Sequence, residues 1–284
     1  MKKIILLSAL IFAIGGIFFL KKNLTKIDLA LPKIESFNPA GLIEEIKKEI
    51  SAPAPLRARR EAVQSFLTAE GVIRLTNVRR GENNLPLLTV NEKLAEAAAL
   101  KIQDMFQNQY FAHESPAGLG ADYWIETANY EFISLGENLA FGNFKDDAEL
   151  VQGWMDSPGH RANILSTKFR EIGVAVKRGT FEGRTTWLAV QEFGRSLASC
   201  PKPREAIKIE IDSTQSAVQT LHAILEVKRL EIENTPKHNR EQYNQKVAEY
   251  NALVQEYNKL VEAIKNLIAN YNNEIQIFNE CLKQ

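Results

Sequence analysis

The chain has 284 residues, and its 35 lysines and arginines balance its 35 aspartates and glutamates, which leaves a formal net charge of zero at pH 7. A chain of this length has room for one well-packed core and a second part. Because it has neither a net positive charge nor a basic run that would follow phosphates, we exclude nucleic acid as a partner.

The first predicted element is a membrane segment. Residues 4–20 are apolar apart from Ser8, and lysines flank this run on both sides. A helix of about 17 residues is roughly 26 Å long, slightly shorter than a hydrocarbon core of about 30 Å. We expect residues 1–22 to remain as a single-pass transmembrane anchor. The alternative is a cleaved signal peptide, but two lysines stand where a cleavage site requires small residues.

Residues 23–60 are predicted to be a linker. Four prolines interrupt it, and Pro53 and Pro55 favour extended backbone, because each proline fixes its own φ and keeps the preceding residue out of the helical region. Only residues 40–50 have the spacing of a short amphipathic helix, with isoleucines and leucine on one face and charges on the other.

Three helices and a hairpin are predicted next. Apolar residues at spacings of three and four indicate helices over residues 69–80, 91–109 and 147–155. Residues 172–177 and 185–193 are rich in β-branched and aromatic residues and are separated by glycines, which is typical of a β-hairpin. This mixture of helices and antiparallel strands predicts an α+β fold.

Residues 201–284 are predicted to form a coiled-coil helical hairpin. Residues 243–284 divide into six heptads, in which successive apolar residues are alternately four and three positions apart. An upstream stretch, residues 207–232, keeps the same spacing, and Thr235-Pro236 then interrupts the helix with a cap and a first-turn proline. The alternative is a long helix that pairs between two chains. The expected seam consists of Ile207, Ile211, Thr214, Val218, Leu221, Leu225, Lys228 and Ile232 in the first helix and Tyr243, Val247, Tyr250, Val254, Tyr257, Val261, Ile264, Ile268, Tyr271, Ile275, Phe278 and Leu282 in the second.

Five short sequence blocks follow one another within residues 69–196. They are Phe111-Ala112-His113-Glu114-Ser115-Pro116, Gly136-Glu137-Asn138-Leu139-Ala140, Gly153-Trp154-Met155-Asp156-Ser157-Pro158-Gly159-His160-Arg161-Ala162-Asn163-Ile164-Leu165, Glu171-Ile172-Gly173-Val174 and Trp187-Leu188-Ala189-Val190-Gln191-Glu192-Phe193-Gly194. Together they resemble the CAP superfamily of cysteine-rich secretory, antigen 5 and pathogenesis-related proteins, in its bacterial secreted branch. The resemblance implies a three-layer α-β-α sandwich over residues 61–200, exported from the cytoplasm.

The same resemblance implies a shared site. In CAP domains the positions of His113, Glu137 and His160 converge in one cleft. Two imidazoles and a carboxylate can hold a divalent metal such as zinc with open positions, or share protons around a polar ligand. We therefore expect these three side chains to meet in a solvent-reachable cleft.

One departure from the family weakens the metal interpretation. Many members carry a second glutamate three residues after the tryptophan, and here, counting from Trp154, that position is Ser157. The adjacent Asp156 is turned by about 100° along a helix and does not simply replace it. Glu192 is predicted to be an exposed strand carboxylate. Asn138, Arg161 and Asn163 are expected to be structural, tying turns to carbonyl groups.

The two cysteines, Cys200 and Cys281, lie outside the predicted core of the domain. One precedes the first helix of the hairpin and the other lies near the end of the second. With helices of about 46 Å and 67 Å and an extended segment after Cys200, the two arms nearly match in length, so we expect an intrachain disulfide. An interchain bond and two free thiols are the alternatives.

The sequence thus predicts an exported, membrane-tethered protein whose His/Glu cleft binds a lipid, glycan, peptide or metal at the cell envelope. It would be secreted if the N-terminal segment were cleaved. The alternative is a metal-assisted hydrolase in which Glu137 is the general base on a water between His113 and His160. A third interpretation places the function in the coiled coil, as a surface for self-association or a protein partner. The missing second carboxylate and the lack of a recognisable nucleophile favour binding over catalysis.

Overall fold

The computed structural model describes residue 43 and residues 48–283. The predicted anchor, residues 1–22, lies outside this range, and no helix within the described range is long and apolar enough to cross a membrane. The chain divides into two compact units. The described part of one is Val218–Lys259, and that of the other comprises residue 43, residues 48–217 and residues 260–283.

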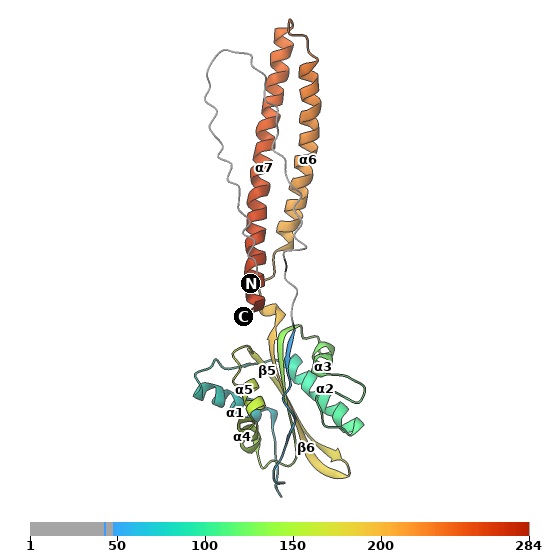
Figure 1. The fold of residues 1–284 in the computed structure, drawn as a ribbon, viewed down its shortest axis with the longest axis vertical. Coiled ribbons are helices and arrows are strands. Elements are labelled where there is room, and N and C mark those ends of the chain that lie inside the picture. Colours follow the sequence, from blue (N-terminus) through green and yellow to red (C-terminus); the bar gives the residue numbers. More distant parts are fainter. Residues whose placement is uncertain (1–42, 44–47, 284) are drawn as a thin grey trace, which may run out of the picture. The chain divides into compact units, whose positions relative to one another are not determined.

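The larger unit is built on one mixed sheet, which runs in the order β1-β4-β6-β5-β3, with β2 on the same edge of β4 as β1 (Figure 1). The long strands β4 and β5 both pair with β6 in antiparallel orientation, and β5 and β6 form the predicted hairpin. The strands are β1 (Glu49–Ser51), β2 (Leu56–Arg57), β3 (Thr89–Val90), β4 (Phe132–Phe141), β5 (Glu171–Phe181) and β6 (Arg184–Ser196).

Helices cover both faces of this sheet. One apolar cluster joins α1, α4 and α5 to one face, and two others join α2 and α3 to the opposite face (Figure 1). The three-layer α-β-α sandwich is therefore confirmed. The helices are α1 (Ala69–Glu82), α2 (Glu92–Asn108), α3 (Ala121–Thr127), α4 (Asp147–Asp156) and α5 (Pro158–Ile164).

Local chemistry explains where these helices begin. The predicted cap Asn91 accepts hydrogen bonds from the backbone at the start of α2, and Asp146 does the same for α4. Close packing of α2 on the sheet depends on Gly173 of β5, because a Cβ there would lie 2.1 Å from the backbone nitrogen of Ala95. The three predicted helices and the hairpin are all confirmed.

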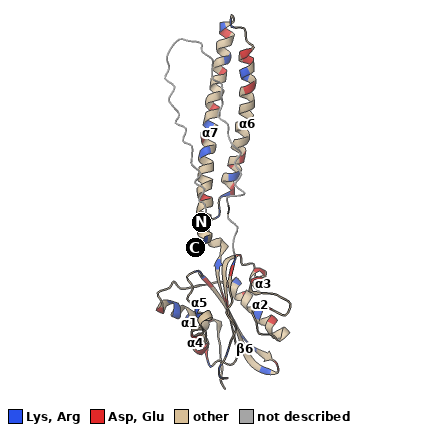
Figure 2. Cartoon of the chain, in the orientation of Figure 1, with Lys and Arg blue, Asp and Glu red and all other residues tan. Residues whose placement is uncertain are grey.

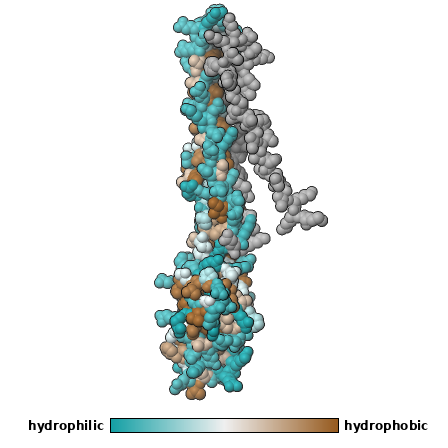
Figure 3. All heavy atoms as spheres, turned by 90° about the vertical axis from the view of Figure 1, so that its left-hand side faces the viewer, coloured by the Kyte–Doolittle hydropathy of each residue, from teal (hydrophilic) through white to brown (hydrophobic). Residues whose placement is uncertain are grey.

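The C-terminal part forms two long helices, α6 (Glu205–Glu233) and α7 (Arg240–Lys283). Every residue of the predicted seam is buried or half-buried, in both helices. Charges of both signs lie along them (Figure 2), and apolar atoms are visible between hydrophilic ones on the face drawn in Figure 3. The exposed apolar residues include Ile209, Ile224, Val227 and Leu230. The expected cap is wrong in detail: α7 begins after Asn239, whose side chain accepts from the backbone of Gln242.

Cys200 and Cys281 form an intrachain disulfide within the larger unit, with their Cα atoms 5.7 Å apart. This confirms the predicted pairing and excludes the interchain bond and the free thiols. Arg195 of β6 donates to the carbonyl oxygen of Cys281 at 2.8 Å. Cys200 is buried with Ile133 and Phe278 in a small apolar cluster. The last turns of α7 are therefore attached to the sheet.

The main correction concerns the predicted linker. Residues 49–57, called the strap below, belong to the sheet: β1 and β2 both pair with β4 in parallel. The linker over 23–60 is therefore wrong for this stretch, and the short helix over 40–50 is wrong at Glu49 and Ile50; most of both lies outside the described residues. Pairing with a strand some 85 positions away depends on tertiary contacts that the local pattern does not carry.

Candidate functional site

Two glutamates form the centre of the site. Glu137 of β4 and Glu192 of β6 are direct partners in the antiparallel ladder, and both side chains are fully buried. Residues paired in this way project from the same face of a sheet. The prediction that Glu192 is an exposed strand carboxylate is wrong, because helices cover both faces of the sheet and β6 therefore has no solvent face here.

Burial and the neighbouring charge of Glu137 raise the pKa of Glu192 well above its ordinary value. Both effects favour the protonated form of Glu192. Lys101 of α2 is also fully buried, and its ammonium group donates to the carbonyl oxygen of His113 at 2.5 Å. Burial lowers the pKa of Lys101, and the carboxylate of Glu137 opposes this effect. Lys101, Glu137 and Glu192 thus lie close enough together for their charges to affect one another.

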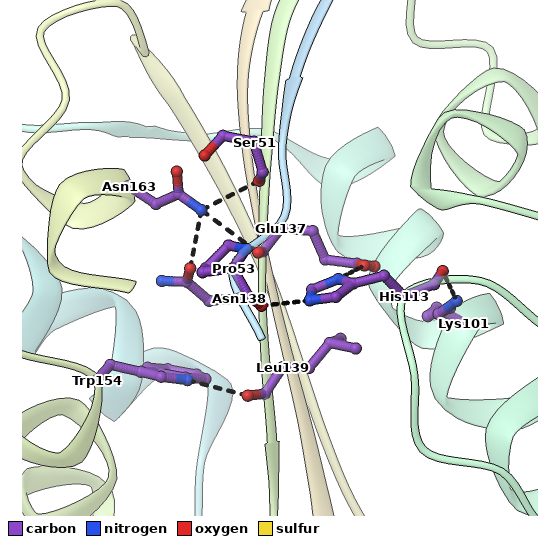
Figure 4. A network of polar contacts seen from close by, with 9 residues as sticks. All are labelled: Ser51, Pro53, Lys101, His113, Glu137, Asn138, Leu139, Trp154 and Asn163. Atoms are coloured by element: carbon purple, nitrogen blue, oxygen red, sulfur yellow. Dashed lines mark hydrogen bonds and ion pairs between the residues drawn. The ribbon is translucent and has the colours of Figure 1, made fainter. Parts of the chain in front are cut away.

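His113 follows α2 and is held from two sides (Figure 4). Its Nδ1 lies 2.5 Å from Oε1 of Glu137, and its Nε2 lies 2.5 Å from the carbonyl oxygen of Pro53. A carbonyl oxygen only accepts hydrogen bonds, so Nε2 carries a proton and donates it. A proton between Nδ1 and Oε1 then joins the ring to the carboxyl group. The predicted meeting of His113 and Glu137 is observed.

His160 of α5 is placed differently. Its Nδ1 lies 2.8 Å from the hydroxyl oxygen of Ser157, and within the described chain its buried Nε2 has no hydrogen-bond partner. Burial, and then the nearby His113, lower the pKa of His160 to about 4, so the ring is neutral at pH 7. His160 lies near His113 but makes no hydrogen bond to it or to Glu137. The serine that replaces the family's second glutamate instead orients this ring.

Asparagine side chains connect the elements around the site. The Asn163 amide donates to Oδ1 of Asn138 at 2.9 Å, to the carbonyl oxygen of Ser51 at 3.2 Å and to that of Glu137 at 3.4 Å. Figure 4 shows how this group joins α5, β4 and the strap. Arg161 donates to the carbonyl oxygen of Met155. The structural roles expected for these residues are confirmed.

The three predicted metal ligands do not point free donor atoms at a common position. Both ring nitrogens of His113 are engaged, and one oxygen of Glu137 is held by His113. In residues 48–283, no group of three or more histidine, cysteine, aspartate or glutamate side chains has an arrangement suited to a metal. The set of His113, His160 and Glu137 thus fits zinc poorly as folded here, and we derive no chemistry through a metal.

The strap covers the site. Glu137 is fully buried and His160 is 1% exposed, so the predicted solvent-reachable cleft is wrong for both. Pro53 packs against Gly159, where an added Cβ would lie 2.6 Å from the Cβ of Pro53. The proline repeat of residues 51–55 was visible in the sequence, but nothing in its pattern indicates which strand it joins.

Comparison with known proteins agrees with the architecture. Residues 73–193 match the model of the cysteine-rich secretory protein (CAP) family. The chain is 30% identical to YkwD of Bacillus subtilis over 174 residues, which is 61% of this chain and 65% of YkwD. It is 26% identical to the membrane protein YlbC of the same species over 169 residues, 57% of this chain and 49% of YlbC. The chain thus spans less than two thirds of either relative.

Solved structures give similar matches. An extracellular protein of Bacillus anthracis that contains an SCP domain is 32% identical, with a TM-score of 0.40, over 45% of this chain and 40% of that one. An outer surface protein of Borrelia burgdorferi is 21% identical, with a TM-score of 0.40, over 47% of this chain and 98% of that one. The family match and the sandwich described above agree, and together they identify residues 73–193 as a CAP domain of the cysteine-rich secretory protein type.

Proposed function

We propose that this protein is a membrane-tethered binding protein of the cell envelope, whose CAP domain recognises a ligand without turnover. YlbC is named a membrane protein, and the Bacillus anthracis protein is named extracellular. Both names agree with an anchor at residues 1–22 and an extracytoplasmic domain. The disulfide between Cys200 and Cys281 supports an oxidising location.

One observation carries the proposal: the Nε2 proton of His113 is presented to a carbonyl oxygen, that of Pro53. Glu137 holds the opposite side of the ring, so the donor has a fixed direction. Because Glu137 is itself buried among Glu192 and Lys101, the ring is supported by groups that have little freedom to rearrange. Such a donor binds a ligand that offers a carbonyl or a similar acceptor.

The hydrolase interpretation requires Glu137 to remove a proton from water between the two histidines. In this structure Oε1 of Glu137 contacts Nδ1 of His113, and the carboxyl group of Glu192 lies close to that of Glu137. His160 is neutral, and its Nδ1 contacts Ser157 rather than Glu137. These contacts suit a positioning carboxylate better than a general base, so we favour binding.

Imidazole resonances of protein labelled with ¹⁵N-histidine test the proposal. The full chain is titrated with three probes: the peptide Ala-Pro-Ala-Pro, chitotriose, and dodecylphosphocholine below its micelle concentration. We expect at least one probe to shift the His113 signals while the signal of the exposed His238 on the hairpin stays in place. If none of the three probes shifts the His113 signals at the highest concentration used, the proposal is contradicted. Cleaved products in the same samples would instead support the hydrolase.

A further inference from the structure

The strap lies where a ligand of His113 would lie. We propose that residues 49–57 are a built-in competitor for this site, and that the true ligand is an extended, proline-containing peptide of another protein, which pairs with the same edge of β4 in place of the strap. This inference rests on the proposed function, since it names the ligand class of that site.

The pairing of the strap with β4 is interrupted beside Glu137. Ser51 pairs with Gly136 and Leu56 with Ala140, so residues 52–55 stand opposite the three residues 137–139. One extra residue on the strap makes this a bulge. Two of the four strap residues there are prolines, which have no N–H to give to a ladder. The backbone pairing thus fails at the one place where the site residues meet the strap.

The site holds the strap by its main chain. His113 donates to the carbonyl oxygen of Pro53, and Asn163 donates to that of Ser51 at 3.2 Å. Main-chain carbonyls are offered by any extended peptide, so a second peptide can make the same two bonds. Addition of a strand to an exposed sheet edge is a common mode of peptide recognition.

The edge of β4 does not depend on the strap over this stretch. The carbonyl oxygen of Glu137 accepts from the Asn163 amide, and that of Leu139 accepts from the indole N–H of Trp154 at 3.3 Å. Side chains of α4 and α5 therefore satisfy these two groups already (Figure 4). Departure of the strap would not leave them without partners, which removes one cost of exchange.

The shape of the site selects proline. Pro53 and Pro55 are half-buried, whereas Ala52 and Ala54 between them are exposed, as expected for an extended chain with alternate residues facing the domain. The proline ring at position 53 fits because Gly159 has no side chain. A larger residue at position 159 would collide with it.

An arginine completes the recognition pattern. The Arg57 guanidinium lies over the rings of Phe111 and Phe141, at 5.2 and 4.8 Å from their centres. Contacts of this kind favour a cation on an aromatic surface. A matching ligand therefore has prolines two residues apart and a basic residue two positions after the second proline.

The strap is weakly attached at its N-terminal end. Glu49 pairs with Lys168, and both side chains are more than half exposed. Exposed ion pairs of this kind contribute little to stability because water and salt screen them. The two strap strands comprise three and two residues, whereas β4 and β6 pair along most of their length. The strap can therefore leave while the central sheet stays intact.

The test uses the full chain and a fluorescently labelled peptide with the sequence of residues 48–60. The strap is weakened mainly by Arg57→Ala, which removes the contact with the Phe111 and Phe141 rings, and to a smaller extent by Glu49→Ala. The double variant should bind this peptide about tenfold more tightly, because a larger fraction of the protein then has a free site. A peptide with both prolines replaced by alanine should bind at least about tenfold more weakly. The comparison of the two peptides is made on one protein, so it does not depend on how well a variant folds.

A second readout locates the binding. The backbone N–H of Ala58 donates to the carbonyl oxygen of Phe141 at 2.9 Å, next to the strap. Unlabelled peptide should speed hydrogen exchange at Ala58 in the wild-type chain, because the strap is displaced, and leave the amides shared by β4 and β6 protected. Gly159→Ala adds a methyl group against the proline position. Introduced into the Glu49→Ala and Arg57→Ala variant, whose strap competes less, it should weaken peptide binding.

Several results would overturn the inference. Equal binding of the proline-free peptide would do so, as would peptide binding without faster exchange at Ala58. Dimers that form in the variant through exchange of straps between copies would assign the site to this chain itself rather than to another protein. If chitotriose or the detergent shifts His113 in the variant and the peptide does not, only this inference fails. If nothing shifts His113 in the variant, the proposed function fails as well.

Discussion

Glu137 on β4 and Glu192 on β6 face each other directly across the ladder, and neither side chain is exposed. Two carboxylates in this arrangement do not both ionise, because burial and mutual repulsion favour a shared proton. Glu137 interacts with both Glu192 and the imidazole of His113, so the carboxyl pair helps to hold the His113 ring in place. The chemistry of the site therefore follows from the pairing of two strands.

The first prediction concerns Glu192→Gln. The pKa of Glu192 is raised in the folded state, so its contribution to stability is complete below the unfolded pKa and is lost as pH rises toward the folded value. The wild-type free energy of unfolding should therefore fall above about pH 4.5, by up to about 1.4 kcal/mol per pH unit, and the amide variant should lack this fall. Urea unfolding at pH 5 and pH 7 measures it.

The exposed Glu210 provides a matched control, since Glu210→Gln makes the same substitution on the surface of α6. The free energy of unfolding of the Glu210→Gln variant should depend on pH as that of the wild type does. If Glu192→Gln and Glu210→Gln behave alike, the carboxyl pair does not share a proton.

His160 should produce the opposite dependence. Its pKa is lowered to about 4 in the folded state, against an unfolded value near 6.5, so its stabilising contribution is present above pH 6.5 and is lost as pH falls toward 4. His160→Gln should reduce the acid sensitivity of unfolding between pH 6.5 and 4. A variant as acid-sensitive as the wild type would show that another group is responsible.

Glu137→Ala should destabilise the domain far more than Glu192→Gln. It leaves His113 and the buried ammonium of Lys101 without the carboxylate that faces them. Breaking a buried charged arrangement by removing one partner costs about 3–5 kcal/mol. Chemical denaturation measures this cost, and Glu137→Gln, which keeps the shape of the side chain, should fall between the variant and the wild type. A loss below about 1 kcal/mol would mean that the cluster is not a single interacting unit.

Several elements followed directly from local patterns. Residues 91–109 carry a helical stripe behind a capping asparagine, and the hairpin strands are separated by glycines; both were predictable because each signal lies within one short stretch. The seam of α6 and α7 was also predictable, since its spacing continues without interruption. The meeting of His113 with Glu137 came from the family resemblance, because no local pattern places a loop beside a distant strand.

The remaining features depend on tertiary contacts. Alternation along β6 suggests a solvent face for Glu192, but helices on both sides remove that face. The proline-rich residues 51–55 indicate extended backbone without naming the strand that they join. The burial of His160 follows from the packing of α5 under the strap, which could not be predicted while the strap was taken for a linker.

Removal of the disulfide is a further prediction. The bond joins residues 81 positions apart, so opening it should lower stability by up to about 4.5 kcal/mol in the chain-entropy model. Cys200→Ser with Cys281→Ser, compared with the wild type under non-reducing conditions, measures the loss. Far-ultraviolet circular dichroism should show that the helices persist. An unchanged midpoint in denaturant would mean that α7 is held to the sheet by Arg195 and the apolar cluster alone.

The most direct test of the account is the long-range ¹H–¹⁵N spectrum of the His113 ring in the full chain. We predict a proton on Nε2 in the free protein, because that nitrogen donates to the Pro53 carbonyl oxygen, and a shift of this signal when the proline peptide replaces the strap. A ring with Nε2 unprotonated would contradict it. So would a His113 signal that stays in place while the peptide is fully bound.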